Sequence, residues 1–235
     1  MIVDLFIPCY VDQVMPQTAW NMIRLLENIG CAVNYNQEQT CCGHPAFEAG
    51  YWDDSREVAQ KFISEFTNDR YIITPTLSCI DFVKKRYADM FSNSSSLNEM
   101  KMLQKNMFEL TDFVVNVLKI SQLGSVTDKR VALIDFCRCS TNTAYAETLL
   151  QKVKGIDLVK VENECCGFGG MFTVKYPNIS TEMTKQLIEK VELTGAEVIV
   201  GIESACIMQL QSYLNEQNSS IKAMSVIDFL AEGLQ

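Results

Sequence analysis

The cysteines are the residues whose number and spacing point most directly to chemistry. The chain has ten cysteines in 235 residues, and eight of them form two sets with the same order: one cysteine, an adjacent pair followed by glycine, and a last cysteine. The first set is Cys9, Cys41, Cys42 and Cys79, and the second is Cys137, Cys165, Cys166 and Cys206. Metal ligation or redox catalysis is the usual reason for so many cysteines in a reducing cytosol. Four thiolates suit an iron–sulfur cluster or a tetrahedral zinc ion.

Glycines follow each adjacent cysteine pair, and they have a physical purpose there. Neighbouring side chains point apart in an extended chain and converge only where the backbone turns tightly, which Gly43 and Gly167 permit. Gly169 and Gly170 are expected to bring further backbone N–H groups close to a ligand, where they can hydrogen-bond cluster sulfurs. A phosphate-binding loop is the competing hypothesis, but the sequence has neither a Walker A lysine nor a full Gly-x-Gly-x-x-Gly.

Three further residues near the two sets call for an interpretation. His44 is the only histidine, which excludes a Cys2His2 zinc site within one chain. It follows the first Cys-Cys-Gly, so it could tune a redox centre or be a structural loop residue, and the sequence leaves this open. Cys31 is expected to be a small buried apolar residue. Cys139 could be a ligand or a bystander.

The segments around the cysteines repeat in the same order as the cysteines do. Apolar runs and helical patterns predict strands within 3–9, 31–35 and 71–74 and again within 131–137, 156–161 and 198–200. Helices are predicted over 18–29 and from near Asp54, with Glu57 completing a capping box, and in the second half over 141–153 and 180–194. Cys79 and Cys206 are each expected at the start of a further helix.

Strands that alternate with helices imply right-handed βαβ crossovers and a parallel sheet. We therefore predict an α/β fold of two pseudo-repeated domains, each a small parallel sheet flanked by helices. Residues 1–128 form the first domain with a connecting helix, in which Met100, Met102 and Met107 are packing residues, and residues 129–235 form the second. The four cysteines of each set should then gather at the carboxyl ends of the strands, where open parallel sheets bind ligands.

The overall composition restricts the class of protein. A formal charge of −9 and a pI near 4.7 oppose nucleic-acid binding, which needs a basic face. The amino-terminal segment lacks a basic region followed by a cleavage site, and no apolar run approaches the roughly 20 residues that span a bilayer. We expect a soluble cytoplasmic protein without a transmembrane segment.

Three stretches of the chain, residues 6–13, 39–47 and 165–177, resemble the cysteine-rich CCG family. This family includes the cysteine-rich subunit of heterodisulfide reductase and the iron–sulfur subunit of glycolate oxidase, and the chain looks most like its lactate-utilisation A branch. The resemblance covers nearly the whole chain. It implies an electron-transfer subunit of a complex that oxidises L-lactate to pyruvate, with [4Fe-4S] clusters, up to one per domain. It also implies partner subunits, among them a ferredoxin-like iron–sulfur protein.

The chain departs from its relatives in its last cysteine motif. Heterodisulfide reductase-like members carry Cys-x-x-Cys there, whereas residues 76–79 read Thr-Leu-Ser-Cys and residues 203–206 read Glu-Ser-Ala-Cys. Each half thus has one cysteine fewer, which argues against the five-thiolate cluster of that relative. Two alternatives remain open: a heterodisulfide reductase-like subunit with a catalytic cluster, and a zinc-stabilised or metal-free scaffold subunit. Zinc can also replace a cluster that fails to assemble, and one half could form a disulfide in air.

Overall fold

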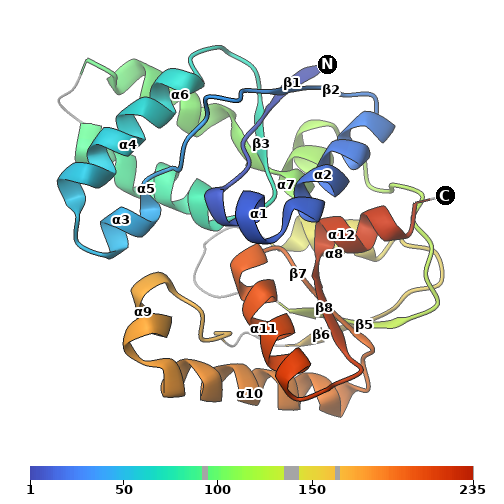
Figure 1. Cartoon of the computed structure of the whole chain (residues 1–235). Helices are drawn as coiled ribbons and strands as arrows, with labels where there is room; N and C mark the ends of the chain where they lie inside the picture. The colour runs from blue at the N-terminus through green and yellow to red at the C-terminus, as the bar shows by residue number, and fades with distance from the viewer. Residues whose placement is uncertain (92–94, 135–142, 162–164, 235) are drawn as a thin grey trace. The chain divides into compact units, whose positions relative to one another are not determined.

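The computed structural model describes residues 1–91, 95–134, 143–161 and 165–234 (Figure 1). The contacts within the chain divide it into two compact units, Met1–Phe113 and Val114–Gln235. The connecting segment 114–128 groups with the second unit by its contacts, whereas the sequence-based division keeps it with the first domain.

Each unit contains a four-stranded parallel sheet, and the two sheets have the same topology. The first has the order β2-β1-β3-β4, and the second has the order β6-β5-β7-β8. The first sheet consists of β1 (Ile2–Leu5), β2 (Ala32–Tyr35), β3 (Ile72–Thr74) and β4 (Met107–Glu109). The second consists of β5 (Arg130–Ile134), β6 (Asp157–Val161), β7 (Val198–Gly201) and β8 (Lys222–Ser225). The predicted pair of α/β repeats is confirmed.

The helices follow the strands in the alternation that the sequence predicts. In the first unit they are α1 (Cys9–Val14), α2 (Pro16–Asn28), α3 (His44–Glu48), α4 (Trp52–Glu65), α5 (Ser78–Phe91), α6 (Leu97–Asn106) and α7 (Leu110–Asp112). A π-helical turn at Phe113–Val117 follows α7. In the second unit they are α8 (Ala144–Leu150), α9 (Gly170–Lys175), α10 (Pro177–Thr194), α11 (Ser204–Glu216) and α12 (Val226–Glu232). Figure 1 shows α11 beside β7 and β8, which it contacts.

Two local predictions are wrong. The capping box at Asp54 and Glu57 does not form, because α4 already begins at Trp52 and no side chain caps its first turn. Asp54 instead lies in that first turn, where its carboxylate interacts favourably with the helix dipole. Met107 is not helical either: it is fully buried and begins β4, a strand that the sequence analysis did not identify.

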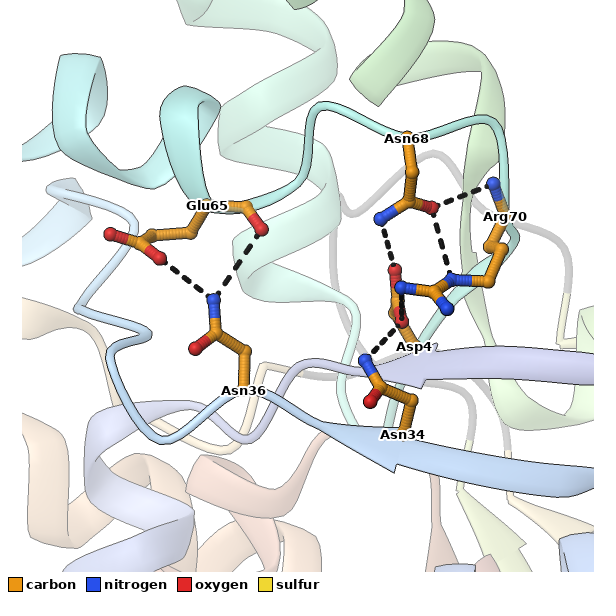
Figure 2. Close-up of polar contacts among 6 residues, drawn as sticks. All are labelled: Asp4, Asn34, Asn36, Glu65, Asn68 and Arg70. Atoms are coloured by element: carbon orange, nitrogen blue, oxygen red, sulfur yellow. Dashed lines mark hydrogen bonds and ion pairs between the residues drawn. The ribbon is translucent and has the colours of Figure 1, made fainter.

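A polar cluster fastens the loop between α4 and β3 to the sheet (Figure 2). Asp4 of β1 is 3% exposed, and its carboxylate accepts hydrogen bonds from the side-chain amides of Asn34 (2.7 Å) and Asn68 (2.8 Å). Arg70 forms an ion pair with the same carboxylate at 3.0 Å. Because a buried carboxylate needs partners for its lone pairs, this arrangement ties the two strands and the loop together.

An aromatic cluster forms much of the core of the first unit. Phe6, at the end of β1, packs edge-on against Phe62 of α4 with ring centroids 4.7 Å apart. Tyr87 of α5 contacts Phe62 (6.4 Å) and Phe91 (5.6 Å) in the same way, and all four rings are at most 1% exposed. The contact between Phe62 and Tyr87 joins α4 to α5 within this core. Within the described residues, no helix is both long and apolar enough to cross a membrane.

Candidate metal centre

The four cysteines of the first set lie together at the carboxyl edge of the first sheet. Cys9 begins α1 just after β1, Cys41 and Cys42 follow β2, and Cys79 lies in the first turn of α5 after β3. The sulfurs of Cys9 and Cys41 are 3.7 Å apart. The Cys42 thiol shares hydrogen bonds with the thiols of Cys41 and Cys79. The four sulfurs therefore form one continuous series of contacts.

The thiols of Cys9, Cys41 and Cys42 are held neutral by hydrogen bonds with neighbouring thiols and by burial, which raise their pKa values. The hydrogen bond to Cys41 raises the pKa of Cys9, and burial adds to the effect. A hydrogen bond with Cys41 lowers the pKa of Cys42, but the contact with Cys79 and complete burial outweigh it and raise the pKa well above the ordinary value. Closely packed sulfurs cannot all ionise without a compensating cation, and a metal ion is the usual one for thiolates.

The donor set fits a thiolate-bound metal group in its chemistry. Cysteine sulfur is the ligand that iron–sulfur clusters and structural zinc ions use. Among the residues that the structure describes, no three Cys, His, Asp or Glu side chains are already arranged as ligands of one metal ion. Binding such a group would therefore require these side chains to adjust.

The turn after the first cysteine pair requires glycine. Gly43 has a φ of 92°, and a Cβ atom there would lie 2.8 Å from the carbonyl oxygen of Ser55. The hydroxyl of Ser55 donates a hydrogen bond of 2.9 Å to the Gly43 carbonyl, and the Gly43 N–H donates to the Cys41 sulfur at 3.4 Å. Gly43 thus makes the turn, and its N–H favours the thiolate form of Cys41.

The second unit repeats this turn with its own residues. Gly167 has a φ of 84°, and a Cβ atom there would clash with the carbonyl of Ser180, whose hydroxyl donates to the Gly167 carbonyl at 2.9 Å. The N–H of Gly169 does not point to a free ligand position, because it donates to the hydroxyl of Thr173 at 3.2 Å. Gly170 begins α9.

The cysteines of the second set are placed differently from those of the first. Cys166 and Cys206 form a disulfide, with their Cα atoms 6.0 Å apart, and Cys165 is exposed. Cys137 and Cys139 lie outside the described residues. The structure thus brings Cys166 and Cys206 together, as the sequence predicts, but in this oxidised form neither sulfur can bind a metal until the disulfide is reduced.

Side chains that the sequence analysis missed hold the carbonyl of the second cysteine in each pair. The Tyr87 hydroxyl donates to the Cys42 carbonyl at 2.7 Å, and burial raises the pKa of Tyr87, so the phenol stays protonated as a donor. In the second unit, Thr184 (2.7 Å) and Gln209 (2.9 Å) donate to the Cys166 carbonyl. Among the residues that hold the two turns, only Ser55 and Ser180 had a signal in the sequence. Each follows the glycine of its turn at nearly the same interval, 12 and 13 residues.

Two further residues have structural partners. The ring of His44 stacks on Phe82 with centroids 4.8 Å apart, and its Nε2 atom lies 3.4 Å from the carboxylate of Glu48. These contacts account for the position of His44 without a ligand. Cys31 is 5% exposed, which confirms that it is a small buried residue.

Comparison with known proteins decides the family. Residues 3–83 and 131–211 each match the family model described as the cysteine-rich domain, CCG. The chain belongs to the CCG cysteine-rich domain family. One matched segment begins in β1 and the other in β5, so each copy of the family domain contains one Cys-Cys-Gly turn.

Relatives of similar length strengthen this assignment. Lactate utilization protein A 1 of Bacillus anthracis is 34% identical over 240 residues, which cover 100% of this chain and 99% of the relative. Lactate utilization protein A of Bacillus licheniformis is 34% identical over 236 residues, with 98% and 99% covered. Among solved structures, an aspartate racemase homologue from Pyrococcus horikoshii covers 99% of this chain and 96% of its own, at a TM-score of 0.33 and 14% identity. This last likeness is too low to bear on the argument.

Proposed function

We propose that this protein is an iron–sulfur electron-transfer subunit of a lactate-utilisation system that oxidises L-lactate to pyruvate. The observation that carries the proposal is the continuous series of sulfur contacts from Cys9 to Cys79. Four cysteines brought from three separate segments of the chain to one sheet edge serve little purpose in packing alone, whereas thiolate ligation explains all of them. Similarity over the full length to the lactate utilization proteins A supports the substrate.

The residues that would hold the clusters follow from the two sets. In the first unit these are Cys9, Cys41, Cys42 and Cys79, and in the second they are Cys137, Cys165, Cys166 and Cys206. A [4Fe-4S] cluster, up to one in each unit, would supply one-electron transfer. The partners would be the other subunits of a cytoplasmic lactate-oxidising complex, including a ferredoxin-like iron–sulfur protein.

The residues around the first set have defined tasks in this proposal. Gly43 makes the tight turn after the adjacent pair, and its N–H donates to the Cys41 sulfur. Tyr87 and the aromatic rings around it exclude water from the inner side of the thiols. A dry surrounding and hydrogen bonds to sulfur are the means by which proteins set the reduction potential of a cluster.

Anaerobic reconstitution with iron and sulfide tests the proposal. We expect a brown protein with a broad charge-transfer absorption and, after reduction, an electron paramagnetic resonance signal. Cys42→Ser should lower the iron content, whereas Cys31→Ser, which removes a buried cysteine outside both sets, should not. A colourless, iron-free wild-type product would overturn the proposal, and equal iron in both variants would overturn the ligand assignment.

One observation favours zinc as a second candidate. A tetrahedral zinc–thiolate site with bonds of about 2.3 Å places its sulfurs about 3.8 Å apart, and the Cys9 and Cys41 sulfurs are 3.7 Å apart. A zinc-stabilised scaffold subunit would contain near-stoichiometric zinc after anaerobic purification and would not gain iron on reconstitution.

Another observation favours a catalytic centre like that of heterodisulfide reductase. Exposed Cys165 is adjacent to the disulfide between Cys166 and Cys206, an arrangement that suits thiol–disulfide exchange. Reduction of many equivalents of a small disulfide by the protein, with a reduced viologen as the electron donor and without partner subunits, would support this function. An electron-transfer subunit would show no such turnover.

A further inference from the structure

A helix that carries the last cysteine of each set also carries a side chain that grips the adjacent cysteine pair. In the first unit, α5 contains both Cys79 and Tyr87, and the Tyr87 hydroxyl donates to the Cys42 carbonyl at 2.7 Å. In the second unit, α11 contains both Cys206 and Gln209, and the Gln209 amide donates to the Cys166 carbonyl at 2.9 Å. Different residue types thus make the same connection in both units.

The side chain of Tyr87 lies in an apolar core, where the Cys42 carbonyl is the hydrogen-bond partner of its hydroxyl. The side chain is fully buried, and its ring packs against Phe62, Phe82 and Phe91 at centroid distances of 5.6–6.4 Å. Phenylalanine would fill this space as well as tyrosine does. The hydroxyl brings one polar atom into an apolar core, which is favourable only because it has a hydrogen-bond partner there.

The Cys42 carbonyl is an important partner because the thiol of the same residue lies between two other cysteines of the first set. The Cys42 residue is 1% exposed, and its thiol contacts the thiols of both Cys41 and Cys79. A hydrogen bond from α5 to the Cys42 main chain therefore ties the Cys-Cys-Gly turn to the helix on which Cys79 is fixed. This tether adds to the hydrogen bond from Ser55 to the Gly43 carbonyl, which holds the same turn from α4.

We infer that Tyr87 is a positioning residue that fixes Cys42 against Cys79, and that Gln209 does the same for Cys166 and Cys206. The inference deepens the proposed function and rests on it, since the positions matter most when these sulfurs bind a common metal group. Tyr87 acts through the main chain of Cys42, whose carbonyl accepts the hydrogen bond from its hydroxyl.

Tyr87→Phe tests the inference, because it removes the hydroxyl and keeps the ring. In the metal-free, reduced full-length protein, we expect iodoacetamide to alkylate Cys42 roughly tenfold faster, since the loss of one buried hydrogen bond makes local opening more frequent. Mass spectrometry of peptides measures the rate. After anaerobic reconstitution, the reduction potential and the paramagnetic resonance spectrum of the first centre should shift as well.

Gln104→Leu is the matched control. The Gln104 side chain also donates to main-chain carbonyls of α5, those of Val83 and Lys84, at 2.8 and 3.3 Å. Gln104→Leu removes these side-chain hydrogen bonds to the same helix and leaves the hydrogen bond between Tyr87 and Cys42 in place. We expect Cys42 alkylation and the cluster spectrum to stay as in the wild type.

A rescue variant separates positioning from general packing. Thr184, which holds the Cys166 carbonyl in the second unit, follows Ser180 by four residues on α10, and Ala59 follows Ser55 by four residues on α4. Ala59 is fully buried. Ala59→Ser in the Tyr87→Phe background therefore offers a hydroxyl from α4 to the same carbonyl, and we expect alkylation of Cys42 to slow again toward the wild-type rate.

Each outcome decides the inference. Wild-type alkylation and an unchanged spectrum in Tyr87→Phe would overturn it, and so would an equal effect of Gln104→Leu. If Tyr87→Phe does not fold, Gln209→Leu combined with Thr184→Val, which removes both donors to the Cys166 carbonyl, tests the same idea through alkylation of Cys166 in the reduced protein, where an unchanged rate overturns it. If the wild type takes up no iron, the proposed function fails, while the alkylation rates still decide the positioning role.

Discussion

The hydroxyl of Ser55 donates a 2.9 Å hydrogen bond to the carbonyl of Gly43. Ser180 and Gly167 repeat it at 2.9 Å in the second unit. In both units the glycine lies so close to the carbonyl of the same serine that a side chain cannot fit between them. The turn that follows each cysteine pair is therefore defined by a helix pressed against it, and the orientation of the sulfurs depends on this contact.

Gly43→Ala should weaken both the fold and the thiol centre. The left-handed φ of 92° costs an L-residue about 1–2 kcal/mol, and the contact of 2.8 Å between the new Cβ and the Ser55 carbonyl adds to that cost. We expect a loss of more than about 2 kcal/mol in the free energy of unfolding in urea, together with a lower iron content after reconstitution.

Gly50→Ala is the control for the backbone term. Gly50 has a similar φ of 88°, but a Cβ atom there meets nothing within 4 Å. Gly50→Ala should lower the free energy of unfolding only by the conformational cost of the left-handed φ, and the iron content should be unchanged. Equal stability of the two variants would show that the contact with Ser55 has no energetic importance.

The parallel sheets and the placement of cysteines just after strands could be predicted because the signals are local. Continuous apolar runs mark β1, β5 and β7. In the sequence each run is followed within a few residues by a cysteine of the two sets: Cys9, Cys137 and Cys206. The outer strands β4 and β8 were missed, since β4 ends in the charged Glu109 and β8 has polar residues at both ends. Such short edge segments take their conformation from the neighbouring strand rather than from their own composition.

The residues that hold the cysteine carbonyls could not be predicted for a different reason. Tyr87 is 45 residues from Cys42, and Gln209 is 43 residues from Cys166. Their partners are main-chain atoms, which every residue has, so no residue pattern marks the pair. Only the packing of the helices against the turns brings them into contact.

The disulfide between Cys166 and Cys206 predicts that metal loading of the second unit depends on reduction. Protein prepared without a thiol reductant should have an intact mass about 2 Da below that of the reduced protein, and reconstitution should load less iron than it does after reduction. The Cys206→Ser variant should lose this mass difference, whereas Cys79→Ser should retain it. An unchanged mass on reduction of the wild type would contradict the pairing.

Asp4→Ala should destabilise the first unit. The change removes the carboxylate that Asn34, Asn68 and Arg70 share in the polar cluster of Figure 2, and it leaves their donors facing a buried gap. We expect a loss of roughly 2–4 kcal/mol in the free energy of unfolding, measured by urea denaturation.

The ion pair between Arg130 and Asp157 provides a comparison for this variant. Its distance of 2.6 Å is shorter than that of the Asp4 pair, but both of its side chains are about half exposed to solvent. Asp157→Ala should therefore cost about 1 kcal/mol or less. A loss as large as that of Asp4→Ala would show that burial of the carboxylate is not what makes the Asp4 cluster important.

Glu109 should make the stability of the first unit depend on pH. Burial raises the pKa of Glu109 to about 7, although hydrogen bonds from Thr111 and the Asp112 amide oppose the shift. The carboxylate of Asp112 faces it from α7 and raises the pKa further, and Lys84 of α5 faces Asp112. One oxygen of Glu109 is buried without a partner, which makes the charged form costly.

The direction of the effect follows from the two protonation states. Between the ordinary pKa of 4.5 and about 7, the folded protein keeps the Glu109 proton that the unfolded chain has lost. Stability therefore falls as pH rises through this range, by up to about 3 kcal/mol, and stays low above it.

Glu109→Gln should remove this loss, because the amide stays neutral and its oxygen can still accept from Thr111. The variant should be more stable than the wild type at pH 8 and should lose that advantage at pH 4, while Glu99→Gln, an exposed change on α6, should follow the wild-type curve. Urea unfolding across this range measures the difference, and a stability gap between Glu109→Gln and the wild type that is the same at both pH values would mean that Glu109 does not titrate with folding.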